Sequence, residues 1–195
     1  MGLVTKKETV SGGIPIWINV LENALGGFTL DTTSLTAGEK ILAGTPISFN
    51  EATRLAKPVK MAKLYASATN VATVYQVEKG HNLVTGEFLA RSVGSASYAI
   101  TGIDKSNAAY DAITLGTTLG VNLSAGDALF QSAASGASAG AFIATPKGLL
   151  YEETNIGVNE SLSVVIRGTI YQRRAPVNSP NLQSLLPTIL FSNSY

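Results

Sequence analysis

Short runs of apolar and β-branched residues, each closed by glycine, proline or polar residues, recur along the chain, whereas helical periodicity is scarce. The clearest run, residues 163–171, predicts a strand in which Gly168 marks a bulge or a close backbone contact. Residues 71–77 are rich in β-branched and aromatic side chains and predict another strand. Residues 188–191 predict a final one. The pattern is that of a mainly β protein.

Two further patterns refine this prediction. Residues 45–49 and 59–64 flank the polar stretch 50–53 and predict a hairpin. Residues 107–113 could form two helical turns after a serine cap, and residues 179–186 begin with a cap followed by proline. We therefore expect a compact β-barrel or β-sandwich with one or two short helices.

A Leu-x-x-Gly-acid motif occurs three times, and each copy is followed by apolar residues. The copies span residues 35–39, 83–87 and 123–127. Glycine supplies the positive φ angle of a tight turn, so the motif predicts structural turns at Gly38, Gly86 and Gly126, each leading into a strand. The unequal spacing of the copies excludes a regular solenoid.

The first 30 residues differ from the rest. Two glycine pairs, Gly12-Gly13 and Gly26-Gly27, bracket an apolar run that contains the only tryptophan, Trp17. Such a segment could be an extended arm that docks elsewhere, or an ordinary first strand. We divide the chain into an N-terminal arm, residues 1–30, and a β-rich domain, residues 31–195.

Composition removes several classes of function. Charged residues make up 14% of the chain, 45% are hydrophobic, and the net charge of +1 gives little attraction for nucleic acid. The absence of cysteine removes thiolate metal sites and thiol nucleophiles, and a single histidine removes two-imidazole sites. Neither a signal peptide nor a membrane-length apolar run is found, so we expect a soluble protein made in the cytoplasm.

The motifs that resemble catalytic ones do not fit their context. Residues 136–140 match G-x-S-x-G, but they lie in a low-complexity stretch, residues 131–141, that we expect to be a loop or a close approach of two backbones. His81 lies at a predicted surface turn. Glu152 and Glu153 are adjacent and would point to opposite faces of a strand. We therefore expect no enzyme activity, no catalytic residue, no cofactor and no metal.

The order of several motifs resembles that of tailed-phage head fibre proteins and capsid decoration (auxiliary head) proteins. The segments that carry this resemblance are residues 44–51, 53–57, 75–81, 83–87, 167–170 and 185–191. The resemblance implies a virion structural protein on the capsid exterior, a homotrimer that binds the major capsid protein and stabilises or decorates the shell. The chain lacks the extended repetitive stalk of a fibre, which favours a compact knob.

Within this interpretation, the arm, residues 1–30, is a candidate capsid anchor. Its apolar residues and an arginine pair are candidate capsid or subunit contacts: Ile14, Ile16, Trp17, Ile18, Arg173 and Arg174. The arginines could instead be a solvated pair. A chain lacking residues 1–27 would be expected to fold but not to bind capsids. Two rivals remain open, a receptor- or glycan-binding knob for a host-surface ligand, with exposed aromatics such as Tyr98 or Tyr110, and an enzyme acting on cell-wall sugars with two converging carboxylates.

Overall fold

The computed structural model describes residues 15–158 and 160–193, and nearly every regular element in this part of the chain is a β-strand. One sheet contains β1 (Trp17–Asn23), β2 (Phe28–Leu30), β4 (Pro46–Asn50), β5 (Leu55–Pro58), β12 (Gly148–Leu150), β14 (Ser161–Leu162), β15 (Val164–Tyr171) and β16 (Ile189–Ser192). Its order is β1-β15-β12-β4-β5-β2-β14, with β16 parallel to β15. The short strands β3 (Lys40–Ile41) and β13 (Thr154–Asn155) pair with each other. The expected mainly β class is confirmed.

A second sheet closes on itself. It contains β6 (Met61–Lys63), β7 (Val74–Val77), β8 (Phe88–Ala90), β9 (Ser97–Asp104), β10 (Asp111–Leu115) and β11 (Ala128–Ser132), in the order β6-β11-β8-β9-β10-β7. Its two ends meet at an antiparallel bridge between Leu64 and Val77. The amide of Tyr65 donates to the carbonyl of Gln76 at 2.9 Å beside this bridge. The six strands therefore form a small barrel, which leaves no free edge along this seam.

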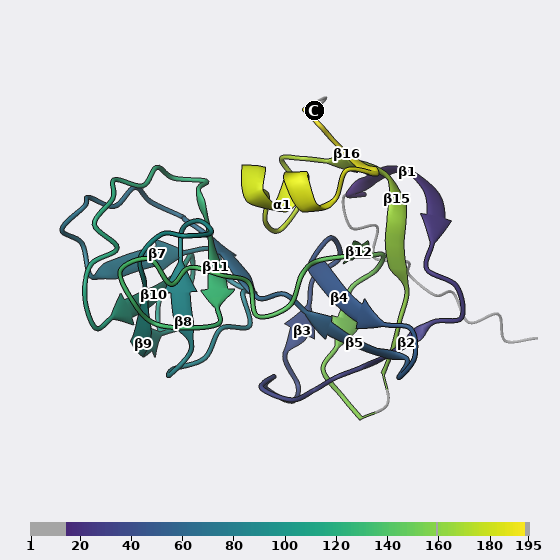
Figure 1. Ribbon diagram of the computed structural model, residues 1–195, viewed down its shortest axis with the longest axis horizontal. Helices are drawn as coiled ribbons and strands as arrows, with labels where there is room; N and C mark the ends of the chain where they lie inside the picture. The colour runs from purple at the N-terminus through teal and green to yellow at the C-terminus, as the bar shows by residue number, and fades with distance from the viewer. Residues whose placement is uncertain (1–14, 159, 194–195) are drawn as a thin grey trace, which may run out of the picture.

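Figure 1 shows the barrel and the eight-stranded sheet as two lobes lying side by side. The barrel strands come from one continuous stretch, residues 61–132, whereas the sheet strands come from both ends of the chain. The barrel is therefore an insertion between β5 and β12. The expected single unit, residues 31–195, is divided between these two lobes, and the sheet lobe also includes residues before 31.

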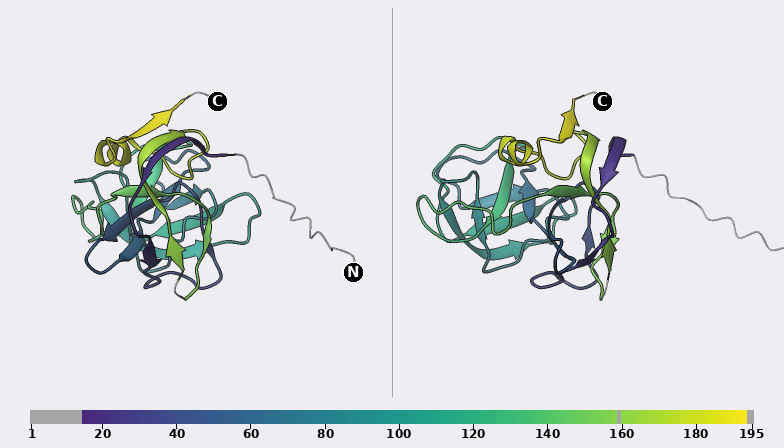
Figure 2. Two further views of the ribbon diagram at one scale, coloured as in Figure 1. Left: turned by 90° about the vertical axis from the view of Figure 1, so that its right-hand side faces the viewer. Right: turned by 45° about the vertical axis from the view of Figure 1, so that its right-hand side comes forward.

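The two lobes share a hydrophobic core at their junction. Helix α1 (Pro180–Leu185) lies over this junction in Figure 1 and in the right-hand view of Figure 2, and its Leu182 is completely buried there. The same core contains Phe130 of the barrel and Ile170 of the sheet lobe. Ser179 caps the helix, because its hydroxyl accepts the amide hydrogen of Leu182. The predicted capped helix at 179–186 is confirmed.

The described part of the expected arm, residues 15–30, is built into the sheet. Strand β1 pairs antiparallel with β15, and β2 pairs with β5 and β14. A methyl group added at Gly168 would lie 2.7 Å from the carbonyl oxygen of Asn19, so this glycine allows β1 to approach β15 closely. The alternative of an ordinary first strand therefore holds for residues 17–23, and removal of residues 1–27 would remove a paired strand.

Two local predictions were wrong. Strand β4 pairs with β5, so the second arm of the hairpin starts at Leu55, while residues 61–63 belong to the barrel. Residues 111–115, expected to lie partly in a helix, form β10, in which buried and half-buried residues alternate. Asp104 and Asn107 accept amide hydrogens two residues ahead of themselves, and such turns compete with a helix.

The low-complexity stretch, residues 131–141, forms a loop and also brings two backbones close together, as the two sequence-based interpretations expected. After β11 it forms a loop, in which Ser138 is exposed. The backbone of this loop also packs on another loop, because a methyl group added at Gly140 would lie 2.4 Å from the carbonyl oxygen of Ser92. Gly136 and Ser97 exchange two backbone hydrogen bonds. Small side chains are required here for close contact between backbones.

Candidate interaction surface and polar cluster

The described candidate contact residues meet at one end of β1 and β15. The amide of Tyr171, the last residue of β15, donates to the carbonyl of Ile16 at 2.8 Å. The guanidinium of Arg174 donates to the carbonyl of Pro15 at 2.8 Å and lies over the ring of Tyr171. Sequence positions about 160 residues apart are therefore neighbours. Ile14 lies outside the described residues.

Only part of this set faces solvent. Ile16 and Trp17 pack against the junction core, and the indole of Trp17 donates to the carbonyl of Tyr151 at 2.8 Å. They fix β1 in place, so they are support for a surface and not the surface itself. Ile18 is 44% exposed, and Arg173 is exposed as well. These two retain the role of candidate contacts.

Arg173 differs from Arg174 in having a free guanidinium. Among residues 15–158 and 160–193 it has neither an ion pair nor a hydrogen bond. It lines a cleft between the lobes together with Lys63, Asn178 and Gln183. A guanidinium in such a position can bind a carboxylate through two parallel hydrogen bonds. An acidic segment of another protein would suit this cleft.

Three exposed apolar residues, in β1, in the turn after it and in β16, were missed by sequence reasoning. Leu21 of β1 is 60% exposed, Leu25 just beyond β1 is 87% exposed and Leu190 of β16 is 64% exposed. Leu190 pairs with Thr169, which pairs with Asn19, so these three positions lie side by side across β16, β15 and β1. The leucines could have been suspected from the apolar character of both segments, but their exposure depends on which strands flank them. We name Ile18, Leu21, Leu25, Arg173 and Leu190, which are exposed residues along these paired strands with Leu25 and Arg173 at opposite ends, the edge surface.

The outer edge of β1 is irregular. Among the described strands β1 pairs with β15 alone, and its register shifts at three places between Trp17 and Asn23. Bulges of this kind twist an edge and discourage the addition of another strand. The edge surface can therefore offer side chains to a partner more readily than a backbone ladder.

The three glycine turns have the same geometry. Gly38, Gly86 and Gly126 have φ angles of 83°, 93° and 90°. In each turn the amide of the acidic residue donates to the carbonyl three residues earlier, and a strand follows: β3, β8 and β11. The prediction of structural turns that lead into strands is confirmed.

Each acidic residue of these turns also has a basic partner. The pairs are Glu39 with Lys105, Glu87 with Lys60, and Asp127 with Arg91. Two of the carboxylates additionally accept the amide hydrogen of the first turn residue. The acids therefore hold the turns and their neighbours together, which is a structural role.

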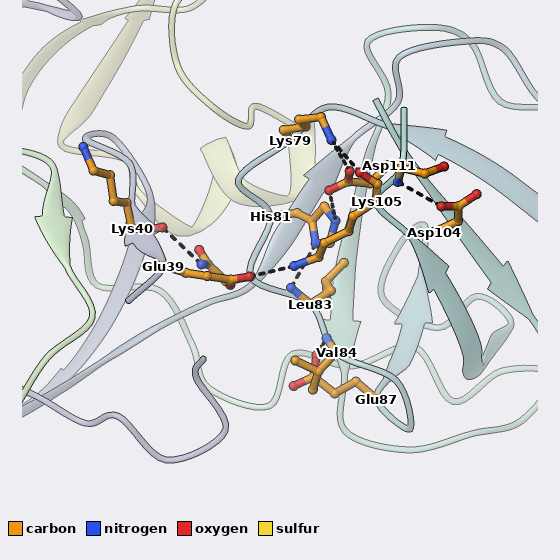
Figure 3. A network of polar contacts seen from close by, with 12 residues as sticks. Glu39, Lys40, Lys79, His81, Leu83, Val84, Glu87, Asp104, Lys105 and Asp111 are labelled. Carbon is orange, nitrogen blue, oxygen red and sulfur yellow. Dashed lines mark hydrogen bonds and ion pairs between the residues drawn. The ribbon is translucent and has the colours of Figure 1, made fainter. Parts of the chain in front are cut away.

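His81 belongs to a polar cluster between the lobes, and it is buried, contrary to the expected surface turn (Figure 3). The amide of Leu83 donates to its Nδ1 at 3.0 Å, so the proton of the neutral ring is on Nε2. This Nε2 lies 3.3 Å from Oδ2 of Asp111, without the alignment of a hydrogen bond. The ammonium of Lys79 donates to the other oxygen of Asp111.

Burial governs the charge state of His81. Loss of solvation lowers the pKa of the imidazole, although Asp111 acts in the opposite direction. Both ring nitrogens face protein groups, and the residue is only 6% exposed. The imidazole is therefore a neutral link between chain segments. Its neighbours Asn82 and Lys105 contact Lys40 and Glu39 of the sheet lobe, which ties the lobes together.

Within the described ranges, no group of three or more acidic or histidine side chains is placed to hold a metal ion. No helix among the same residues has the length and apolarity needed to cross a membrane. Of the two adjacent glutamates, Glu153 forms an ion pair with Lys40.

The geometry defines an all-β protein in which a closed barrel is inserted into an open sheet.

Comparison of the chain with protein-family models, with curated proteins and with solved structures found no match.

Proposed function

We propose that this protein is an accessory structural protein of a phage head, a fibre base or decoration knob that binds the outside of the capsid through the edge surface. The observation that carries the proposal is the set of exposed aliphatic side chains along β1 and β16, together with Arg173 beyond the end of β15, which has no partner among the residues that the structure describes. Large apolar residues gathered on a surface are typical of sites where another protein binds. The order of the motifs, which resembles that of head proteins, supports this choice of partner.

The energetics favour a protein partner. Complete burial of one leucine or isoleucine contributes about 1.5–3 kcal/mol, so three or four of them supply a large part of a specific binding energy. A salt bridge from Arg173 to an acidic residue of the capsid would add specificity more than affinity. The net charge of +1 does not oppose close packing against a lattice of other subunits.

The assembly state is part of the proposal. The resemblance implies a homotrimer, and a chain with few surface charges suits contacts between copies. Measurement of the mass in solution by light scattering tests this part directly. A monomer at micromolar concentration would remove the trimer from the proposal but leave capsid binding to be tested on its own.

The decisive experiment is co-sedimentation with phage capsids assembled from the major capsid protein alone. Leu21→Asp places a charge at the centre of the edge surface, and Arg173→Glu reverses the charge at its rim. We expect the first variant to lose binding and the second to weaken it. Val93→Asp is the matched control, since Val93 is 59% exposed but lies in a loop of the barrel lobe. Circular dichroism checks that each variant is folded.

Equal binding by Leu21→Asp and the unmodified protein would show that the edge surface is not the docking site. Failure of the unmodified protein to sediment with capsids would overturn the proposed function itself.

A further inference from the structure

The seam that closes the barrel carries an ordered outer face. Tyr65 lies opposite Gln76 across the seam, and Gln76 pairs with Ala112 of β10. Their neighbours Leu64 and Val77 are almost completely buried in the barrel core. Because side chains alternate along a strand, Tyr65, Gln76 and Ala112 point outward in one row.

A second row lies beside the first. Lys63 and Glu78 form an ion pair of 2.8 Å on the outside of the seam. Tyr110 precedes Asp111, whose buried side chain points inward to His81, so Tyr110 takes the outer face. The ring of Tyr110 reaches the ring of Tyr65, with centroids 5.3 Å apart and planes tilted by 32°. Two tyrosines, one just after β6 and one just before β10, thus form one aromatic pair.

The polar groups of this outer face are available to a ligand. Tyr65 is 48% exposed. In the part of the chain that the structure describes, the two tyrosine hydroxyls and the side-chain amide of Gln76 have no hydrogen-bond partner. The small Ala112 lies beside Gln76 at the end of the row, so the neighbouring position on β10 carries no long side chain. Nearby Val74 of β7 is also exposed.

The same face has no net charge, because Lys63 and Glu78 neutralise each other. It therefore lacks the field that would attract a nucleic acid or an acidic polymer. Rigid amphipathic rings beside unsatisfied hydroxyl and amide groups suit a ligand that has both apolar C–H faces and many hydroxyls.

We propose that the face formed by Tyr65, Tyr110, Gln76 and the Lys63–Glu78 pair is a binding platform for an uncharged oligosaccharide. The tyrosine rings pack against the C–H face of a sugar ring. The amide of Gln76 and the carboxylate of Glu78 hydrogen-bond to neighbouring hydroxyls. The platform belongs to the barrel lobe and the edge surface to the sheet lobe, and of the platform residues Lys63 also lines the cleft that contains Arg173.

The test starts with the full chain on a printed array of neutral and acidic oligosaccharides. We expect binding to neutral members that persists at high salt. The dissociation constant for the best neutral oligosaccharide is then measured by calorimetry for Tyr65→Ala, Tyr110→Ala and Gln76→Ala. Loss of one stacked ring is expected to raise the dissociation constant about tenfold or more. Tyr151→Ala, which removes an exposed tyrosine from the other lobe, is the control and should bind as the unmodified protein does.

The absence of binding to any neutral oligosaccharide, or unchanged affinity in folded Tyr65→Ala, overturns the platform. So does binding restricted to acidic glycans and abolished by salt, because it would require a basic surface. The outcome is separable from the proposed function. Tyr65→Ala should sediment with capsids normally, and Leu21→Asp should keep its affinity for the oligosaccharide.

Discussion

The ammonium group of Lys60 forms an ion pair with the carboxylate of Glu87, and both side chains are almost completely shielded from water. Lys60 lies between β5 of the sheet lobe and β6, the first strand of the barrel, whereas Glu87 belongs to the second glycine turn. The same ammonium donates to the carbonyl of Ser34 near the first turn. One buried cation therefore joins the junction of the lobes to two turns.

Removal of the cation should destabilise the fold strongly. Lys60→Met leaves the carboxylate of Glu87 buried without its partner, and breaking a buried pair in this way costs about 3–5 kcal/mol. Urea unfolding followed by circular dichroism measures the loss. The control is Lys40→Met, since the Lys40–Glu153 pair is largely exposed and contributes less than about 1 kcal/mol. Equal effects of the two variants would show that Lys60 is not a structural link.

The glycine turns allow a test of backbone conformation alone. Nothing lies within 4 Å of a methyl group added at Gly86, so the cost of Gly86→Ala comes from its φ of 93°. We expect a loss of about 1–2 kcal/mol in the free energy of unfolding. Gly102→Ala is matched, because that position is equally open but has no positive φ, and it should change stability by less than about 1 kcal/mol. A neutral Gly86→Ala would mean that the turn can relax.

The features that the sequence predicted well are those set by local chemistry. The three turns need glycine at one position, the helix at 180–185 needs its serine cap, and β15 has a run of β-branched residues. Each of these is determined within about ten residues, so no knowledge of distant partners was necessary.

Features that depend on distant partners were missed. The division into two lobes arises because the two ends of the chain pair with each other around the inserted barrel. Trp17 was expected to be a contact residue, but its strand register places it on the junction core. His81 is buried because Asp111 and the sheet lobe come together around it, which no local pattern indicates.

The close approach of β1 to β15 yields a further prediction. Gly168→Ala would place a methyl group against the carbonyl of Asn19, which belongs to the backbone and cannot rotate away. We expect β1 to separate from β15 and its amides to exchange hydrogen faster, as measured by mass spectrometry. Capsid binding should decrease when β1 separates from β15, because β1 carries Leu21 of the edge surface. Gly116→Ala, which meets only a methyl of Thr101 at 3.6 Å, should leave exchange in β1 unchanged. Protected β1 amides in Gly168→Ala would refute the argument.

The buried His81 predicts how stability depends on pH. Its pKa in the fold lies below the ordinary 6.5, chiefly because of burial, with Lys105 acting in the same direction and Asp111 and Glu39 against it. When the pH falls below about 6.5, the unfolded chain takes up a proton that the folded chain does not. The free energy of unfolding should therefore decrease as the pH falls from 7 to 5, by up to about 1.4 kcal/mol per pH unit.

Urea unfolding at a series of pH values measures how the free energy of unfolding changes with pH, and His81→Gln isolates the contribution of His81. Glutamine does not titrate, so the variant should have nearly constant stability over this range, whatever its stability at neutral pH. Aspartates such as Asp31 and Asp104 do not obscure the result, since their pKa values are lowered in the fold from an ordinary 3.8. These aspartates remain ionised in the folded and the unfolded chain above pH 5, and their contribution to stability is lost only at lower pH. Parallel pH profiles for the two proteins would show that His81 is not the titrating group.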